Sequence, residues 1–115
     1  MNLEYLREYC LKKPGVEESL PFGKETLVFK VMGKLFLLTN LESFGSVNLK
    51  CTPELATELR ERYPAVKPGY HMNKKHWNTI LIDGSINDEK ILDWVDLSYR
   101  LVVDKLPKKL QIELR

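Results

Sequence analysis

The chain has 115 residues, of which 43% are hydrophobic and 30% charged. This length suits a single domain, residues 1–115, whose core needs no disulfide or metal to hold it. No apolar run approaches the roughly 18 residues of a membrane span, and Met1 leads directly into a charged amphipathic segment, so we expect a cytoplasmic protein without a membrane partner.

The net charge is +2 and the isoelectric point is about 8.5. Dedicated nucleic-acid domains more often exceed an isoelectric point of about 9, with their basic residues clustered on one face. The totals therefore permit an anionic partner without requiring one. Cys10 and Cys51 lie far apart and form no CxxC motif, which predicts two reduced thiols.

The N-terminal half predicts a helix followed by three strands. Leu3, Leu6 and Cys10 form one helical stripe behind a possible Asn2 cap, and Pro14-Gly15 ends the helix. The next elements are a loop over residues 16–23 and strands over residues 26–32, 35–40 and 46–51, with a tight turn at Gly33-Lys34. In the third strand, Val47, Leu49 and Cys51 alternate with polar residues, which predicts one apolar face.

The C-terminal half predicts two more helices around at least one strand. A helix starts at Thr52-Pro53 and ends near Tyr63, and an irregular connection leads to a strand from about His76 to Ile82. The last helix has an apolar stripe in which Ser98 favours close packing against the sheet or a bond to a carbonyl one turn earlier. Residues 108–115 form a basic tail or a short extra turn.

This element order predicts the fold class. We expect an α+β two-layer sandwich, in which an antiparallel sheet carries helices on one face only, in the order α-β-β-β-α-β(β)-α.

The patterns for metal binding and nucleophilic catalysis are weak. His71 and His76 fall on opposite faces of a strand and about 140° apart on a helix, so they do not converge on one ion. Cys51 precedes a helix cap, where a thiol can be activated, but the strand alternation points it into the core. No phosphate-binding glycine loop or serine elbow is present. We predict no metal, no cofactor and no catalytic residue.

A basic and aromatic stretch between the second and third helices is the strongest candidate site. Lysines can contact phosphates, and aromatic side chains can stack on bases or wedge into a groove. The candidate nucleic-acid-binding residues are Lys67, Tyr70, His71, Lys74, Lys75, His76 and Trp77, with Lys30, Lys34 and Lys50 as outlying contributors. The alternative is that the lysines only solubilise this surface and Trp77 packs into the core.

The sequence also resembles a known family through a series of short motifs. These are Pro21-Phe22-Gly23, the Lys30–Lys34 turn, Leu49-Lys50-Cys51 with Pro53-Glu54, the block PGYHMNKKHWN at Pro68–Asn78, Asp83-Gly84-Ser85, and Ser98-Tyr99. Together they resemble the MmcQ/YjbR family of small bacterial proteins, and the central block is the specific part. The match covers nearly the whole chain in order.

The resemblance implies a compact fold that is described as CyaY-like or secretion-chaperone-like, with a double-wing arrangement and a DNA-binding function. Frataxin-like proteins of related fold bind iron through acidic surfaces, but this chain has no long acidic ridge. Secretion chaperones bind extended segments of other proteins. The two hypotheses are therefore a non-enzymatic DNA-binding protein and a protein- or peptide-interaction module that uses the sheet face or a strand edge.

Overall fold

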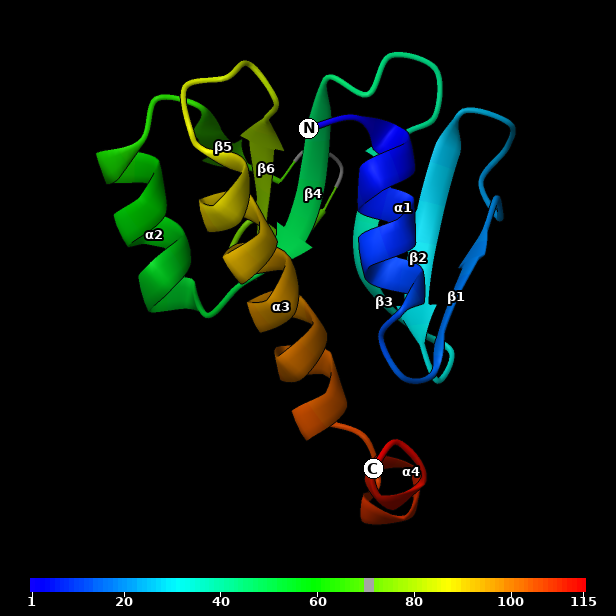
Figure 1. Cartoon of the computed structure of the whole chain (residues 1–115). Coiled ribbons are helices and arrows are strands. Elements are labelled where there is room, and N and C mark those ends of the chain that lie inside the picture. Colours follow the sequence, from blue (N-terminus) through cyan, green and yellow to red (C-terminus); the bar gives the residue numbers. More distant parts are fainter. Residues whose placement is uncertain (70–71) are drawn as a thin grey trace.

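The computed structural model describes residues 1–69 and 72–115 (Figure 1). Its elements are α1 (Leu3–Leu11), β1 (Val16–Ser19), β2 (Thr26–Val31), β3 (Lys34–Asn40), β4 (Ser46–Lys50), α2 (Pro53–Arg62), β5 (Val66–Pro68), β6 (Trp77–Leu81), α3 (Asp88–Asp104) and α4 (Lys108–Glu113). The strands form one sheet in the order β1-β2-β3-β4-β6-β5, and every neighbouring pair is antiparallel.

Helices α1, α2 and α3 lie together in front of one face of this sheet, and α4 lies beyond its lower end (Figure 1). The predicted α+β class, with an antiparallel sheet and helices on one face, is confirmed. We call the two sides the helix-covered face and the open face. Within the described ranges, no helix is long and apolar enough to cross a membrane.

One edge strand was not predicted, and the other was predicted only as an optional second strand before the last long helix. β1 lies in the stretch that was expected to be a loop, and its sequence VEES lacks an apolar alternation because Glu18 faces the helices and bonds to Arg7. β5 has three residues and ends at Pro68, which a sheet edge tolerates because its missing N–H can face solvent. Both strands are recognisable only through their neighbours in the sheet.

The helix-covered face holds the main core. Leu27, Phe29 and Val31 of β2 are buried there. The apolar stripe of α3 packs onto this face through Ile91, Val95, Ser98 and Val102, all of which are buried.

Ser98 has a more specific place than close packing. Its hydroxyl is buried, donates to the carbonyl of Phe36 at 2.6 Å and accepts from the backbone N–H of Lys50 at 2.8 Å. The ladder between β3 and β4 stops at the Leu37–Leu49 pair, so this hydroxyl bridges two strands where they separate. It does not bond back along its own helix, which was the local alternative.

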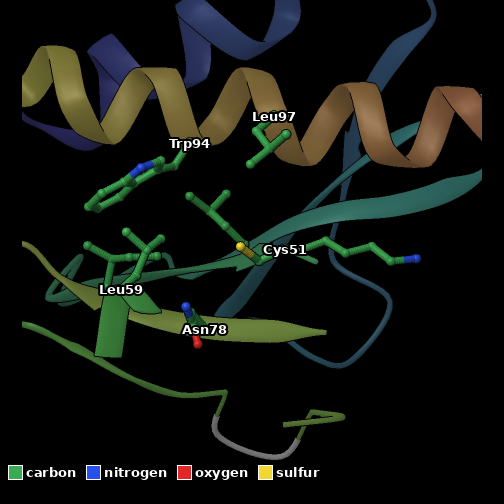
Figure 2. A pocket seen from close by; sticks show the side chains of 8 residues that line it. Cys51, Leu59, Asn78, Trp94 and Leu97 are labelled. Atoms are coloured by element: carbon green, nitrogen blue, oxygen red, sulfur yellow. The ribbon is translucent and has the colours of Figure 1, made fainter. Parts of the chain in front are cut away.

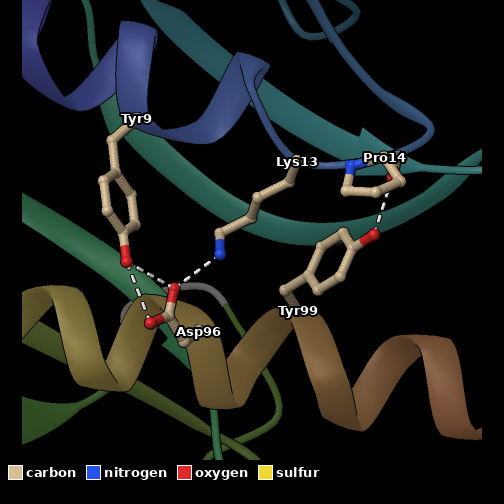
Figure 3. A network of polar contacts seen from close by, with 5 residues as sticks. All are labelled: Tyr9, Lys13, Pro14, Asp96 and Tyr99. Atoms are coloured by element: carbon tan, nitrogen blue, oxygen red, sulfur yellow. Dashed lines mark hydrogen bonds and ion pairs between the residues drawn. The ribbon is translucent and has the colours of Figure 1, made fainter.

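A polar network fastens α1 to α3 (Figure 3). The Tyr9 hydroxyl donates to both carboxylate oxygens of Asp96, and Lys13 Nζ lies 2.5 Å from Asp96 Oδ1. The Lys13 ammonium also lies over the rings of Tyr9 and Tyr99, while the Tyr99 hydroxyl donates to the carbonyl of Pro14. Because all of these groups are partnered, we read the network as a clamp that sets the end of α1.

The open face carries a second, smaller apolar cluster. Val28, Leu38 and Trp77 are buried there, and Leu35 and Met72 pack beside them. The polar residues Thr26, Asn40, Ser46 and Asn48 continue the same face toward the opposite end of the strands. The open face is therefore half apolar and half polar along its length.

Candidate nucleic-acid interface

The chain entering β6 is held by backbone contacts and by one arginine. Asn73 accepts from the N–H of Lys75 through its side chain, and its carbonyl accepts from the N–H groups of His76 and Trp77. The guanidinium of Arg60, from α2, donates to the carbonyls of Lys74 and Trp77 and to Asn78 Oδ1. Lys74 and Lys75 thus project from a fixed turn.

Residues near both ends of the Pro68–Asn78 motif build the fold. Asn78 is 1% exposed, and its amide donates to the carbonyl of Ala56 in α2. Gly69 lies so close to β6 that an added Cβ would sit 2.8 Å from Trp77 Cβ. These contacts explain why the motif has an asparagine at position 78 and a glycine at position 69.

Trp77 does not lie where its predicted role requires. It was expected to stack on bases or wedge into a groove, but it is 8% exposed and packs on Val28 and Leu38. Its alternative role, packing into the interior, is what the structure has. His76 is half-buried, and its carbonyl accepts from the N–H of Cys51. The predicted residues Tyr70 and His71 lie outside the described residues.

The predicted lysines, apart from Lys67, gather at one end of the sheet. β2 ends and β3 begins at the Met32-Gly33 turn, which places Lys30 and Lys34 there. Lys50 closes β4 at the same end, because it lies one position beyond the last β3–β4 pair and opposite Trp77. The turn with Lys74 and Lys75 leads directly into Trp77. We call this end, defined by Lys30, Lys34, Lys50, Lys74 and Lys75, the basic end.

The C-terminal segment adds to the basic end. α3 runs down to it and α4 lies beside it (Figure 1). Burial lowers the pKa of Lys50, and the neighbouring charge of Lys105 lowers it further, which places Lys105 near Lys50. Leu114 contacts the chain at Gly15, whose carbonyl accepts from the turn residue Met32. The basic tail was visible in the sequence, but its position beside the β2–β3 turn was not.

Lys67 stands apart from this group. It is exposed on the edge strand β5, opposite Thr79, two residues along β6 from Trp77. Lys67 therefore lies on the lateral edge of the sheet, not among the lysines of the basic end.

Acidic residues concentrate at the other end of the strands. Glu25 precedes β2, Glu42 lies in the β3–β4 turn, and Asp83 follows β6. Asp88 and Glu89 open α3, and Asp88 pairs with the N-terminal ammonium at 3.1 Å. The separation is incomplete: Lys24 and Lys90 lie at the acidic end, and Glu17, Glu54, Asp104 and Glu113 lie toward the basic end. The basic end nevertheless holds more positive charge than the net charge of +2 for the whole chain indicates.

A hollow of about 520 Å³ opens on the polar half of the open face. The described residues that line it are Phe22, Thr26, Leu38, Thr39, Asn40, Ser46, Asn48 and Met72, and none of these carries a charge. Phe22, on the loop between β1 and β2, is 68% exposed. This hollow was not predicted; the clue in the sequence was the run of polar residues on one face of the strands.

The two thiols are buried in the core. Burial raises the pKa of Cys51 to about 11 and that of Cys10 to about 12. Cys51 borders a cavity of about 10 Å³ between the sheet, α2 and α3, together with Asn78, Leu59, Trp94 and Leu97 (Figure 2). A space of this size holds about one water molecule, not a substrate. Among the described side chains, no three His, Cys, Asp or Glu residues are grouped as a metal site requires.

This arrangement defines a class of small α+β protein with helices on one sheet face, an open second face and a basic end. Comparison with known proteins identifies the group within that class. The sequence matches the YjbR family over residues 11–101, and the chain belongs to that family. The predicted MmcQ/YjbR resemblance is confirmed.

Relatives of this chain cover nearly its whole length. It is 39% identical over 118 residues to YjbR of Escherichia coli K12, spanning 99% of this chain and 100% of that protein. It is 40% identical over 113 residues to YbdF of Escherichia coli O157:H7, spanning 97% and 93% of the two chains. The crystal structure of a Deinococcus radiodurans protein superposes with a TM-score of 0.91 at 38% identity, covering 98% of this chain and 87% of that one.

Proposed function

We propose that this protein binds DNA without catalysis, through phosphate contacts made by the basic end. The observation that carries the proposal is the convergence of Lys30, Lys34, Lys50, Lys74 and Lys75 at one end of the sheet. These residues are far apart in the sequence, and a surface of lysines that only solubilised the fold would not need to gather in one place. Lys105 and the lysines of α4 extend the same surface.

Lysine ammonium groups supply the electrostatic part of nucleic-acid affinity, which does not depend on base sequence. The protein therefore contacts the phosphate backbone rather than reading bases in the major groove. Trp77 has a structural part in this surface, because it anchors the start of β6 and hence the turn that carries Lys74 and Lys75.

The edges of the sheet support this hypothesis over strand addition by a peptide. β1 carries Glu17 and Glu18, and charges on an edge strand oppose pairing with another chain. β5 has only three residues and ends at Pro68, which has no N–H to donate. The protein-interaction alternative thus lacks a suitable edge.

The test is fluorescence anisotropy with a labelled DNA duplex over a salt series. We expect binding at about 50 mM salt and a logarithmic affinity that falls by about 0.9 for each phosphate contacted. The double variant Lys74→Gln/Lys75→Gln should bind more weakly and reduce that slope by about 1.8, if each lysine meets one phosphate.

A matched control is Arg62→Gln/Lys90→Gln, which removes the same two charges from exposed positions away from the basic end. This control should leave both affinity and slope unchanged. The DNA proposal is refuted if the wild-type protein binds neither this duplex nor a single strand of DNA at about 50 mM salt, or if the two double variants behave alike. Recovery of one partner protein without nucleic acid from a lysate would support the interaction module.

A further inference from the structure

The hollow and the basic end lie on one continuous surface. Leu38, on the floor of the hollow, is paired with Val28 on the neighbouring strand β2. Lys30 follows two residues after Val28 and lies on the same face of β2. Asn48 also lines the hollow, and Lys50 follows it two residues along β4. Two residues span about 7 Å of a strand. The floor of the hollow therefore ends where the lysines begin.

The lining of the hollow suits an uncharged polar ring. Asn48 Oδ1 accepts from the Thr79 hydroxyl at 2.5 Å, which orients the amide and leaves its Nδ2, among the described residues, without a protein acceptor. Thr26 and Ser46 add hydroxyl groups, and Phe22 and Met72 add an aromatic and a thioether wall. The volume of about 520 Å³ lies within the range typical of small-ligand sites.

A nucleobase combines these properties, because it has hydrogen-bonding edges, two apolar faces and no charge, and phosphates flank it. Stacking on an exposed aromatic side chain beside a basic groove is a general means of binding single strands. A base inside a duplex has neither face free. We propose that the hollow holds one unpaired base of a single-stranded nucleic acid whose phosphates lie along Lys30 and Lys50, an inference that rests on the function proposed above.

The experiment compares labelled single strands of about 12 nucleotides with a duplex of the same length, at equal salt. The wild-type protein should bind oligothymidylate or oligouridylate at least about ten-fold more tightly than the duplex, and the tighter of the two identifies the strand as DNA or RNA. Phe22→Ala should weaken single-strand binding by about ten-fold or more and leave duplex binding unchanged. Because Phe22 is 68% exposed, its removal should not disturb the fold.

Two further variants give the control and an independent test. Leu20→Ala removes an apolar side chain that is 45% exposed on the same loop but does not line the hollow, and it should change neither affinity by more than about two-fold. Ser46→Phe places a ring inside the hollow at a strand position that favours aromatics, so it should abolish the preference for single strands while the protein stays folded.

The outcomes separate this inference from the function on which it rests. Equal affinity for strand and duplex, together with a Phe22→Ala variant that binds like wild type, overturns the base-binding hollow and leaves phosphate-driven DNA binding standing. Absence of binding to both probes at about 50 mM salt overturns DNA binding and, with it, the hollow's assignment.

Discussion

Removing the Ser98 hydroxyl should destabilise the protein more than a typical serine-to-alanine change. The hydroxyl is 0% exposed and satisfies two backbone groups, the carbonyl of Phe36 and the N–H of Lys50. Leaving a buried backbone group unpaired costs about 1–3 kcal/mol, and alanine returns roughly half a kcal/mol through its better helix propensity. With both groups unpaired the cost is about 2–6 kcal/mol, so Ser98→Ala should lower the free energy of unfolding by about 1.5–5.5 kcal/mol.

For 115 residues, this loss corresponds to a melting temperature lower by roughly 6–22 °C. Urea unfolding followed by circular dichroism measures the change, and hydrogen exchange at the Lys50 amide should accelerate because its acceptor is gone. Ser43→Ala, in the exposed β3–β4 turn, is the control and should stay within about 0.5 kcal/mol of wild type. A loss below about 0.5 kcal/mol for Ser98→Ala would refute the bridging role.

Two further predictions concern titration. The hydrogen bond from Arg7 lowers the pKa of Glu18, so the contribution of Glu18 to stability is present above its unfolded pKa of about 4.5 and is lost as the pH falls through its folded pKa. The difference in free energy of unfolding between wild type and Glu18→Gln should therefore be constant from pH 7 to about 5 and shrink from there to pH 3, as measured by chemical denaturation. Burial raises the pKa values of Cys10 and Cys51 to about 12 and about 11, so both thiols should react slowly with Ellman's reagent at about pH 8 until the chain unfolds. Fast reaction of either thiol in the native protein would contradict its buried position.

The sequence predicted those elements whose local pattern agrees with their tertiary role. The apolar stripe of α3 and the alternation around Val47 and Leu49 are strong because one side of each faces the core. β1 and the position of β5 escaped prediction because an edge strand is defined by its partner's hydrogen bonds rather than by its own composition. Ser98 was placed on the correct face, but the gap that it bridges depends on where two distant strands separate.

The candidate site was predictable only as far as its residue types, because its assembly depends on tertiary structure. The lysines were visible as residue types, whereas their convergence needed the directions of β2, β3, β4 and β6. The direction of Trp77 was not predictable, because it directly follows basic residues in the sequence yet faces an apolar cluster in the sheet. Phe22 was named only as part of the Pro21-Phe22-Gly23 motif, without a binding role, because only the fold brings it to the hollow.

The uneven placement of charge along the strands makes one end of this nearly neutral chain more cationic than the other. In the field of a polyanion such a molecule experiences a torque that turns the lysines forward before contact, so productive collisions become more frequent than the net charge indicates. The effect fades as the Debye length shrinks to about 8 Å at physiological salt. The same asymmetry should make the protein adhere to a cation exchanger even at a pH where its net charge is zero.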